Sequence, residues 1–94
     1  MSELIWDFKS SDESGGIIEQ KIWAVSKTRE NPFGYKFSLC YIKDGKRILC
    51  YDNGENKPPH KHYRNKEYPY NFKDMWTLLA DFSIDLEKTK RGEI

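Results

Sequence analysis

The chain has 94 residues, and its 16 Lys and Arg stand against 15 Asp and Glu, which gives a net charge of +1. This balance excludes a histone-like polycation, so any affinity for nucleic acid must come from a local patch rather than from the overall field. Hydrophobic residues make up 37% and aromatic residues 15%, which predicts a thin core built on large rings. We expect a single domain over residues 1–94, with a core over about 3–88 and a frayed tail over 89–94.

The first third of the chain predicts two strands. Leu4 to Phe8 alternates weakly between apolar and polar residues and predicts a first strand, and the polar, glycine-rich segment 10–16 predicts a turn. Gly16 to Ser26 is rich in Ile, Val and Trp, which is typical of a second strand. Pro32 marks a break after it, because proline cannot donate a hydrogen bond to a β-ladder.

The middle of the chain predicts a β-hairpin. Tyr35 to Ile42 alternates cleanly, and Arg47 to Asp52 is its expected partner strand. The Asp44-Gly45 pair between them is a strong signal for a tight type I′ turn. A two-residue turn would pair Leu39 with Cys50, so that Asp52 ends the apolar face of its strand.

The same register bears on the two cysteines. Cys40 and Cys50 would point to opposite faces of the hairpin, so we expect no disulfide between them. The sequence shows no signal peptide and no apolar stretch long enough to span a bilayer. We therefore expect a reduced, cytoplasmic protein without membrane association.

The last third predicts a loop and then a helix. Residues 53–67 are expected to form a loop, residues 68–72 a short extended piece, and a helix should begin at Asn71 or Asp74 and end near Lys88. Its apolar residues recur at helical spacing, at Met75, Leu78, Leu79, Phe82 and Leu86. The predicted fold class is α+β: a small antiparallel sheet of about four strands with the C-terminal helix packed on one face.

The predicted loop gathers the chain's only two histidines among four cations. His60 and His62 are two residues apart, so in extended chain their side chains lie on the same side. Histidine exchanges protons near neutral pH, and the surrounding cations favour an anion. The segment after Asp52 therefore predicts a site for an anionic substrate.

RNA cleavage is the chemistry that this set suits best. Attack by a ribose 2′-hydroxyl on the neighbouring phosphate needs a base, an acid and cations, and it needs no cofactor. We expect His60 and His62 to exchange protons and Asp52 to orient one imidazole. The expected RNA-binding residues, among which an arginine clamps phosphate and a tyrosine stacks a base, are Lys57, Lys61, Tyr63, Arg64 and Lys66.

Several alternatives stay open at this point. Asp52, His60 and His62 could instead bind a divalent metal ion and leave a position open, which would make the protein a metal-dependent nuclease or transferase. Both histidines could also be ordinary surface residues of a module that binds RNA or protein without cutting. Asp81 and Asp85, four residues apart on the helix, form either a carboxylate pair for phosphate chemistry or a solvated face.

Six short segments are specific in their order and spacing rather than one by one: Ile22-Trp23, Tyr35-Lys36-Phe37, Tyr51-Asp52-Asn53, His60-Lys61-His62, Tyr68-Pro69-Tyr70-Asn71-Phe72 and Leu78-Leu79-Ala80-Asp81-Phe82. On these segments the chain, from about residue 17 to 86, resembles the TumE-type toxins of bacterial and archaeal toxin–antitoxin modules. The family pattern continues the Tyr-Asp-Asn step with a glycine- and histidine-rich loop, whereas here residues 54–59 form a longer loop with lysine and proline. The resemblance implies a growth-inhibiting toxin that a cognate DNA-binding antitoxin neutralises.

The three tryptophans allow two interpretations. Trp6, Trp23 and Trp76 either all lie in the core, or some are exposed. An exposed apolar patch would mark a surface for the antitoxin or for a homodimer.

Overall fold

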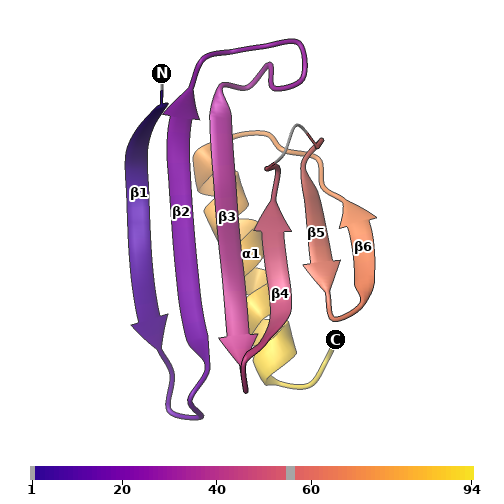
Figure 1. The fold of residues 1–94 in the computed structure, drawn as a ribbon. Coiled ribbons are helices and arrows are strands. Elements are labelled where there is room, and N and C mark those ends of the chain that lie inside the picture. Colours follow the sequence, from indigo (N-terminus) through magenta and orange to yellow (C-terminus); the bar gives the residue numbers. More distant parts are fainter. Residues whose placement is uncertain (1, 55–56) are drawn as a thin grey trace.

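The computed structural model describes residues 2–54 and 57–94, and within them one sheet lies against one helix (Figure 1). The elements are β1 (Ser2–Ser11), β2 (Ile17–Val25), β3 (Tyr35–Lys43), β4 (Lys46–Asp52), β5 (His60–Tyr63), β6 (Lys66–Pro69) and α1 (Met75–Lys90). The strands lie in the sheet in chain order, and each pairs antiparallel with the next. The α+β class is confirmed, and the helix covers only one face of the sheet.

The sheet has six strands among the described residues, so the prediction of about four is too low. The additional pair, β5 and β6, lies largely in the segment predicted as a loop; residues 55–56 of that segment are outside the described residues. These strands are four residues each and mostly polar. They lack the apolar alternation by which strands are recognised in a sequence.

The core lies between the sheet and α1. From the helix, Leu78, Phe82 and Leu86 are buried, which confirms the predicted apolar stripe. The helix follows Asp74, one of its two predicted starts, whose carboxylate accepts a hydrogen bond from the Thr77 N–H at 2.7 Å. The sheet contributes mainly the central strands: Ile22, Phe37, Leu39, Tyr41, Leu49 and Tyr51.

The β3–β4 hairpin turns where predicted but pairs in a different register. Asp44 and Gly45 both have positive φ, at 53° and 73°, as a type I′ turn requires. Beyond the turn, Ile42 pairs with Arg47 while Tyr41 pairs with Leu49, so one additional residue lies in β4. Such a bulge reverses the facing of every later residue in the strand.

The bulge corrects two predictions. Cys40 lies directly opposite Cys50, with 4.1 Å between their Cα atoms, and the two form a disulfide, so the expectation of reduced cysteines is wrong. The bulge also removes Asp52 from the helix-facing side, where Tyr51 lies buried instead. Asp52 therefore lies on the open face of the sheet.

Candidate active site on the open face of the sheet

The Tyr51-Asp52-Asn53 step gives each side chain a different direction. The Tyr51 hydroxyl donates to the Asp85 carboxylate on α1. The Asn53 side chain turns to β3, where its oxygen accepts the Phe37 N–H at 2.9 Å and its amide donates to a further β3 carbonyl at 2.8 Å. The contacts of Tyr51 and Asn53 thus hold the backbone of Asp52 in place, while the Asp52 carboxylate faces the open side of the sheet.

Strand β5 brings both histidines beside this carboxylate. Asp52 pairs with His60 across the ladder, and Cys50 pairs with His62, so the two imidazoles lie on the face of Asp52. The His60 Nε2 lies 3.3 Å from the Asp52 Oδ1, and the centroids of the two imidazole rings are 4.8 Å apart. The structure brings together the three residues that the sequence singled out, with one donor atom of each within 4.8 Å of the others.

Glu67 is a fourth member of the site that the sequence analysis missed. It pairs with His62 across the β5–β6 hairpin, and its Oε1 lies 3.2 Å from the His62 Nε2 and 3.6 Å from the His60 Nε2. Interpreting the segment as a loop hid this partner. The spacing of five residues between His62 and Glu67 is the one signal that could have found it, because a two-residue turn makes such positions neighbours.

His60 is held in one orientation by the chain just before it. Its Nδ1 lies 2.9 Å from the Pro58 carbonyl oxygen, which can only accept, so Nδ1 carries a proton. The residue is 7% exposed, and its Nε2 is turned to the two carboxylates. The Pro58 carbonyl therefore fixes the tautomer, while Asp52 contacts the other nitrogen and also accepts the Gly54 N–H at 3.2 Å.

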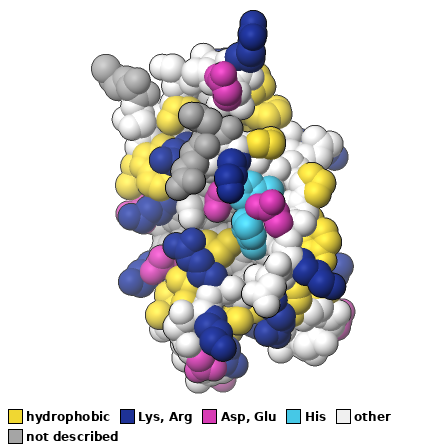
Figure 2. All heavy atoms as spheres, turned by 45° about the vertical axis from the view of Figure 1, so that its right-hand side comes forward, with side chains coloured by type: hydrophobic (Ala, Val, Ile, Leu, Met, Phe, Trp, Pro, Cys, Tyr) yellow, Lys and Arg dark blue, Asp and Glu magenta, His cyan; other side chains and the backbone are white. Residues whose placement is uncertain are grey.

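A hollow of about 340 Å³ lies over these residues. Besides Asp52 and the two histidines, Lys36 and Lys57 line it, and so does Trp23, whose ring centroid is 5.5 Å from the Lys36 Nζ. Figure 2 shows the histidines at the surface beside acidic and basic side chains. The site thus combines groups that move protons with cations and an aromatic ring.

Comparison with known families agrees with the resemblance noted in the sequence. A family model described as Toxin TumE matches residues 4–90, nearly the whole chain. The chain belongs to the TumE toxin family. Neither the curated proteins nor the solved structures contain a match.

Membership of the TumE family makes the chain a toxin of the toxin–antitoxin type and implies a cognate antitoxin as its partner. In the described part of this TumE-family chain, no helix has the length and apolar character needed to cross a membrane.

Three of the expected RNA-binding residues of this TumE-family chain lie away from the histidines. Lys61 points to the helix side, where its Nζ is 3.0 Å from the Asp85 Oδ2. By strand alternation Tyr63 shares that side, and Lys66 is its cross-strand partner. Of the expected set, the structure brings only Lys57 to the hollow over the histidines.

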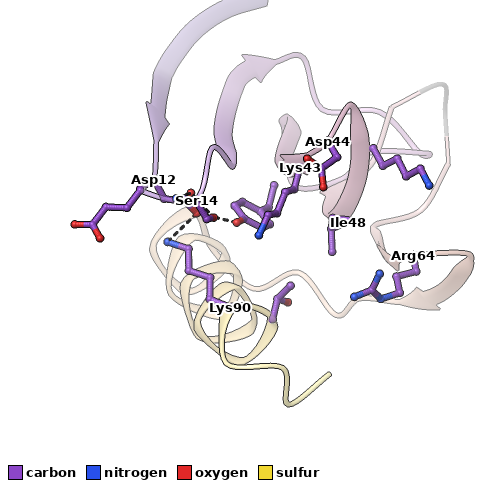
Figure 3. A pocket seen from close by; sticks show the side chains of 11 residues that line it. Asp12, Ser14, Lys43, Asp44, Ile48, Arg64 and Lys90 are labelled. Atoms are coloured by element: carbon purple, nitrogen blue, oxygen red, sulfur yellow. Dashed lines mark hydrogen bonds and ion pairs between the residues drawn. The ribbon is translucent and has the colours of Figure 1, made fainter.

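Arg64 lies at a second cavity, of about 730 Å³, between the β3–β4 turn and the end of α1 (Figure 3). On one side of this cavity Lys90 lies 3.7 Å from Asp12, which also accepts the Tyr41 hydroxyl at 2.7 Å. Arg64 is on the other side, in the β5–β6 turn with a φ of 55°. Strand β5 ends at Tyr63, so Arg64 does not lie on the histidine side as an expected phosphate-binding residue would.

Asp81 and Asp85 each accept a tyrosine hydroxyl, one from just after β6 and the other from β4. Asp81 accepts the Tyr70 hydroxyl at 2.6 Å, and Asp85 accepts the Tyr51 hydroxyl beside Lys61. Burial, and then these bonds to carboxylates, raise the pKa of both tyrosines above the ordinary value. The two acids thus tie the helix to β4 and to the segment after β6, which favours neither of the two interpretations drawn from the sequence.

The tryptophans do not share one environment. Trp76 is 68% exposed, so the interpretation that places all three in the core is wrong, while Trp6 and Trp23 are half-buried. An apolar groove of about 450 Å³ lies between β1 and α1, lined by Trp6, Trp76, Phe8 and Leu79 among others. This groove is a candidate surface for a protein partner.

Proposed function

We propose that this toxin arrests growth by cleaving RNA at the cluster of Asp52, His60, His62 and Glu67. The observation that carries the proposal is the meeting of two imidazoles and two carboxylates beside one hollow that two lysines line. A phosphodiester needs groups of this kind for cleavage without a cofactor: a base, an acid and positive charge. The predicted cytoplasmic location belongs to the same proposal: because the cysteines form a disulfide, it rests on the proposed RNA substrate and no longer on reduced thiols.

The geometry suggests how the roles divide. Glu67 accepts a hydrogen bond from the Nε2–H of His62. The Nδ1 of His62 is then unprotonated and takes the proton of the ribose 2′-hydroxyl. His60, with Nδ1 bonded to Pro58, carries a second proton on Nε2 beside Asp52 and gives it to the leaving oxygen. The His62 side chain is 41% exposed, so it is open to the substrate. The His60 side chain is 9% exposed and meets the substrate only through the hollow that it lines.

The reaction is an internal transesterification, in which the phosphoryl group passes from the 5′-oxygen to the 2′-oxygen of the neighbouring ribose. The 2′-oxygen forms a bond to phosphorus, the bond from phosphorus to the 5′-oxygen breaks, and the 5′-oxygen leaves with a proton from His60. The products are a 2′,3′-cyclic phosphate and a 5′-hydroxyl end. Lys36 and Lys57 balance the charge on the phosphate, and Trp23 offers a face on which a base stacks.

The test is cleavage of a single-stranded RNA by the purified protein in the presence of EDTA, with analysis of the product ends. We expect cyclic phosphate ends from the wild type and no cleavage of the same oligonucleotide with 2′-deoxy sugars. His62→Ala should lower the rate at least about 100-fold, the lower end of what a positioned acid or base contributes. Tyr68→Phe, an exposed position on β6, is the control and should cleave like the wild type.

Three outcomes would count against the proposal. RNA that stays intact with and without divalent metal excludes cleavage, and growth arrest that survives replacement of both histidines indicates a binding module instead. Cleavage that EDTA abolishes would assign Asp52, His60 and His62 to a metal-dependent nuclease.

A further inference from the structure

The four side chains of the site follow one another in contact, from Asp52 to His60, Glu67 and His62. Three pairs of donor atoms lie 3.3 Å (His60 to Asp52), 3.6 Å (His60 to Glu67) and 3.2 Å (His62 to Glu67) apart. An N–H···O hydrogen bond is 2.7–3.2 Å long, so both contacts of the His60 Nε2 exceed that range. Both carboxylates therefore lie beside the His60 Nε2 without a hydrogen bond of ordinary length to it.

Three of the spacings match the edge of a tetrahedron around a small metal ion, and the donor atoms of Asp52, His60 and His62 all lie within 4.8 Å of one another. Zinc binds nitrogen and oxygen ligands at about 2.0–2.2 Å, which places the ligand atoms of a tetrahedral site about 3.3–3.6 Å apart. The three measured separations lie within about 0.1 Å of that range. From the geometry we propose that Asp52, His60, His62 and Glu67 bind one divalent transition-metal ion of the zinc type.

The environment of His60 supports a metal ligand. Its Nδ1 donates to the Pro58 carbonyl, the backbone contact that typically orients a ligating imidazole and turns its Nε2 lone pair to a metal. Without a proton or an ion on Nε2, that lone pair would face two carboxylate oxygens. An ion at this point would lie between the ring nitrogen and the two carboxylates and would compensate their charge.

The donor set also selects the ion. Two imidazoles and two carboxylates suit zinc, cobalt and their neighbours, whereas magnesium and calcium prefer oxygen ligands only. Thiolates do not compete for the ion in the oxidised protein, since both cysteines are in the disulfide.

The inference deepens the proposed function and rests on it in one respect. The ion would replace the proton on the His60 Nε2, which the proposed cleavage gives to the leaving oxygen. One equivalent of Zn²⁺ should therefore slow cleavage at least about tenfold. Binding itself does not depend on that mechanism.

The experiment measures Zn²⁺ and Co²⁺ binding to the full, untagged, oxidised chain by competition with a chromophoric chelator. We expect one ion per chain, visible absorption typical of tetrahedral Co²⁺, and no comparable binding of Mg²⁺. Glu67→Gln and His62→Ala change partly exposed side chains, and each should weaken Zn²⁺ binding at least about tenfold. Glu87→Gln, an exposed helix residue, is the matched control and should bind like the wild type.

The two proposals fail separately. If Zn²⁺ does not bind, or binds Glu67→Gln, His62→Ala and the wild type equally, the metal site is excluded while RNA cleavage stands. If Zn²⁺ binds as expected and RNA stays intact, the metal site stands and the ribonuclease proposal falls. If one equivalent accelerates cleavage, the metal site also stands, and the role given to His60 as a proton donor is excluded.

Discussion

Asp52 and His60 lie directly opposite each other across β4 and β5, and one additional residue in β4 decides that they meet on the open face. Without the bulge near Ile48, Asp52 would point to the helix and Tyr51 would point to the histidines. The site and the core of this toxin are therefore set by the same irregularity of the hairpin.

The first prediction concerns Asn53, which is 8% exposed and holds the end of β4 to β3. Asn53→Ala would leave the Phe37 N–H and the Tyr35 carbonyl without these bonds, at 2.9 and 2.8 Å. The Tyr35 carbonyl still accepts the Asn31 side-chain amide at 2.6 Å, so of these two groups the Phe37 N–H is the one left without its side-chain partner. A buried polar group that loses its partner costs about 1–3 kcal/mol, and we expect the free energy of unfolding to fall by that amount. Urea denaturation measures the change, and Asn71→Ala, at an exposed position, is the control.

Because Asn53 also positions the backbone of Asp52, the same substitution should weaken the proposed cleavage in protein that is still folded. A wild-type midpoint of unfolding for Asn53→Ala would exclude the structural role assigned to these bonds.

How far the sequence predicts this fold depends on how much apolar surface a segment carries. The helix stripe at Leu78 and Phe82 and the turn at Asp44-Gly45 were predictable, because helical spacing and turn chemistry are local signals. The pairing of Cys40 with Cys50 was not predictable, because no residue pattern in the Arg47–Asp52 segment indicates that β4 contains a bulge. A strand such as β5, HKHY, carries too little apolar alternation to be recognised.

The site was predictable in part for the same reason. Asp52, His60 and His62 are close in sequence and have side chains typical of catalytic and metal sites, so it could be expected that they lie together. The position of Glu67 depends on the β5–β6 pairing, and the contact of Lys61 with Asp85 depends on where the helix lies. Both are long-range facts of the fold.

The second prediction concerns the contact between the sheet and the helix at Tyr51. Tyr51→Phe keeps the ring in the core but removes the hydroxyl that donates to Asp85, next to Lys61. A hydrogen bond to a charged group contributes about 1.5–3 kcal/mol, and we expect a loss of that size in the free energy of unfolding. Thermal and urea unfolding measure it against Tyr68→Phe, and equal stability of the two variants would contradict the assignment.

The third prediction concerns the Cys40–Cys50 disulfide, which closes a loop of 10 residues. Chain-entropy arguments give such a loop about 2.5–3 kcal/mol of stabilisation, so reduction should lower the midpoint of urea unfolding accordingly. A Cys40→Ala, Cys50→Ala double variant should unfold like the reduced wild type and should not respond to reductant. A wild-type midpoint that reductant leaves unchanged would show that the bond does not contribute to stability.

The fourth prediction concerns the acid side of the stability profile. Hydrogen bonds, first from Tyr41 and then from Ser14 and Gly16, hold the pKa of Asp12 well below its ordinary value of 3.8. A carboxylate with a lowered pKa in the folded state stabilises the protein fully above the unfolded value and loses this contribution as the pH falls toward the folded one. Unfolding measured in steps between pH 5 and pH 2.5 should therefore show stability falling below about pH 4, with a shallower slope in Asp12→Asn. Asp7→Asn, an exposed acid on β1, should keep the wild-type slope, and parallel curves for wild type and Asp12→Asn would contradict the role of this carboxylate.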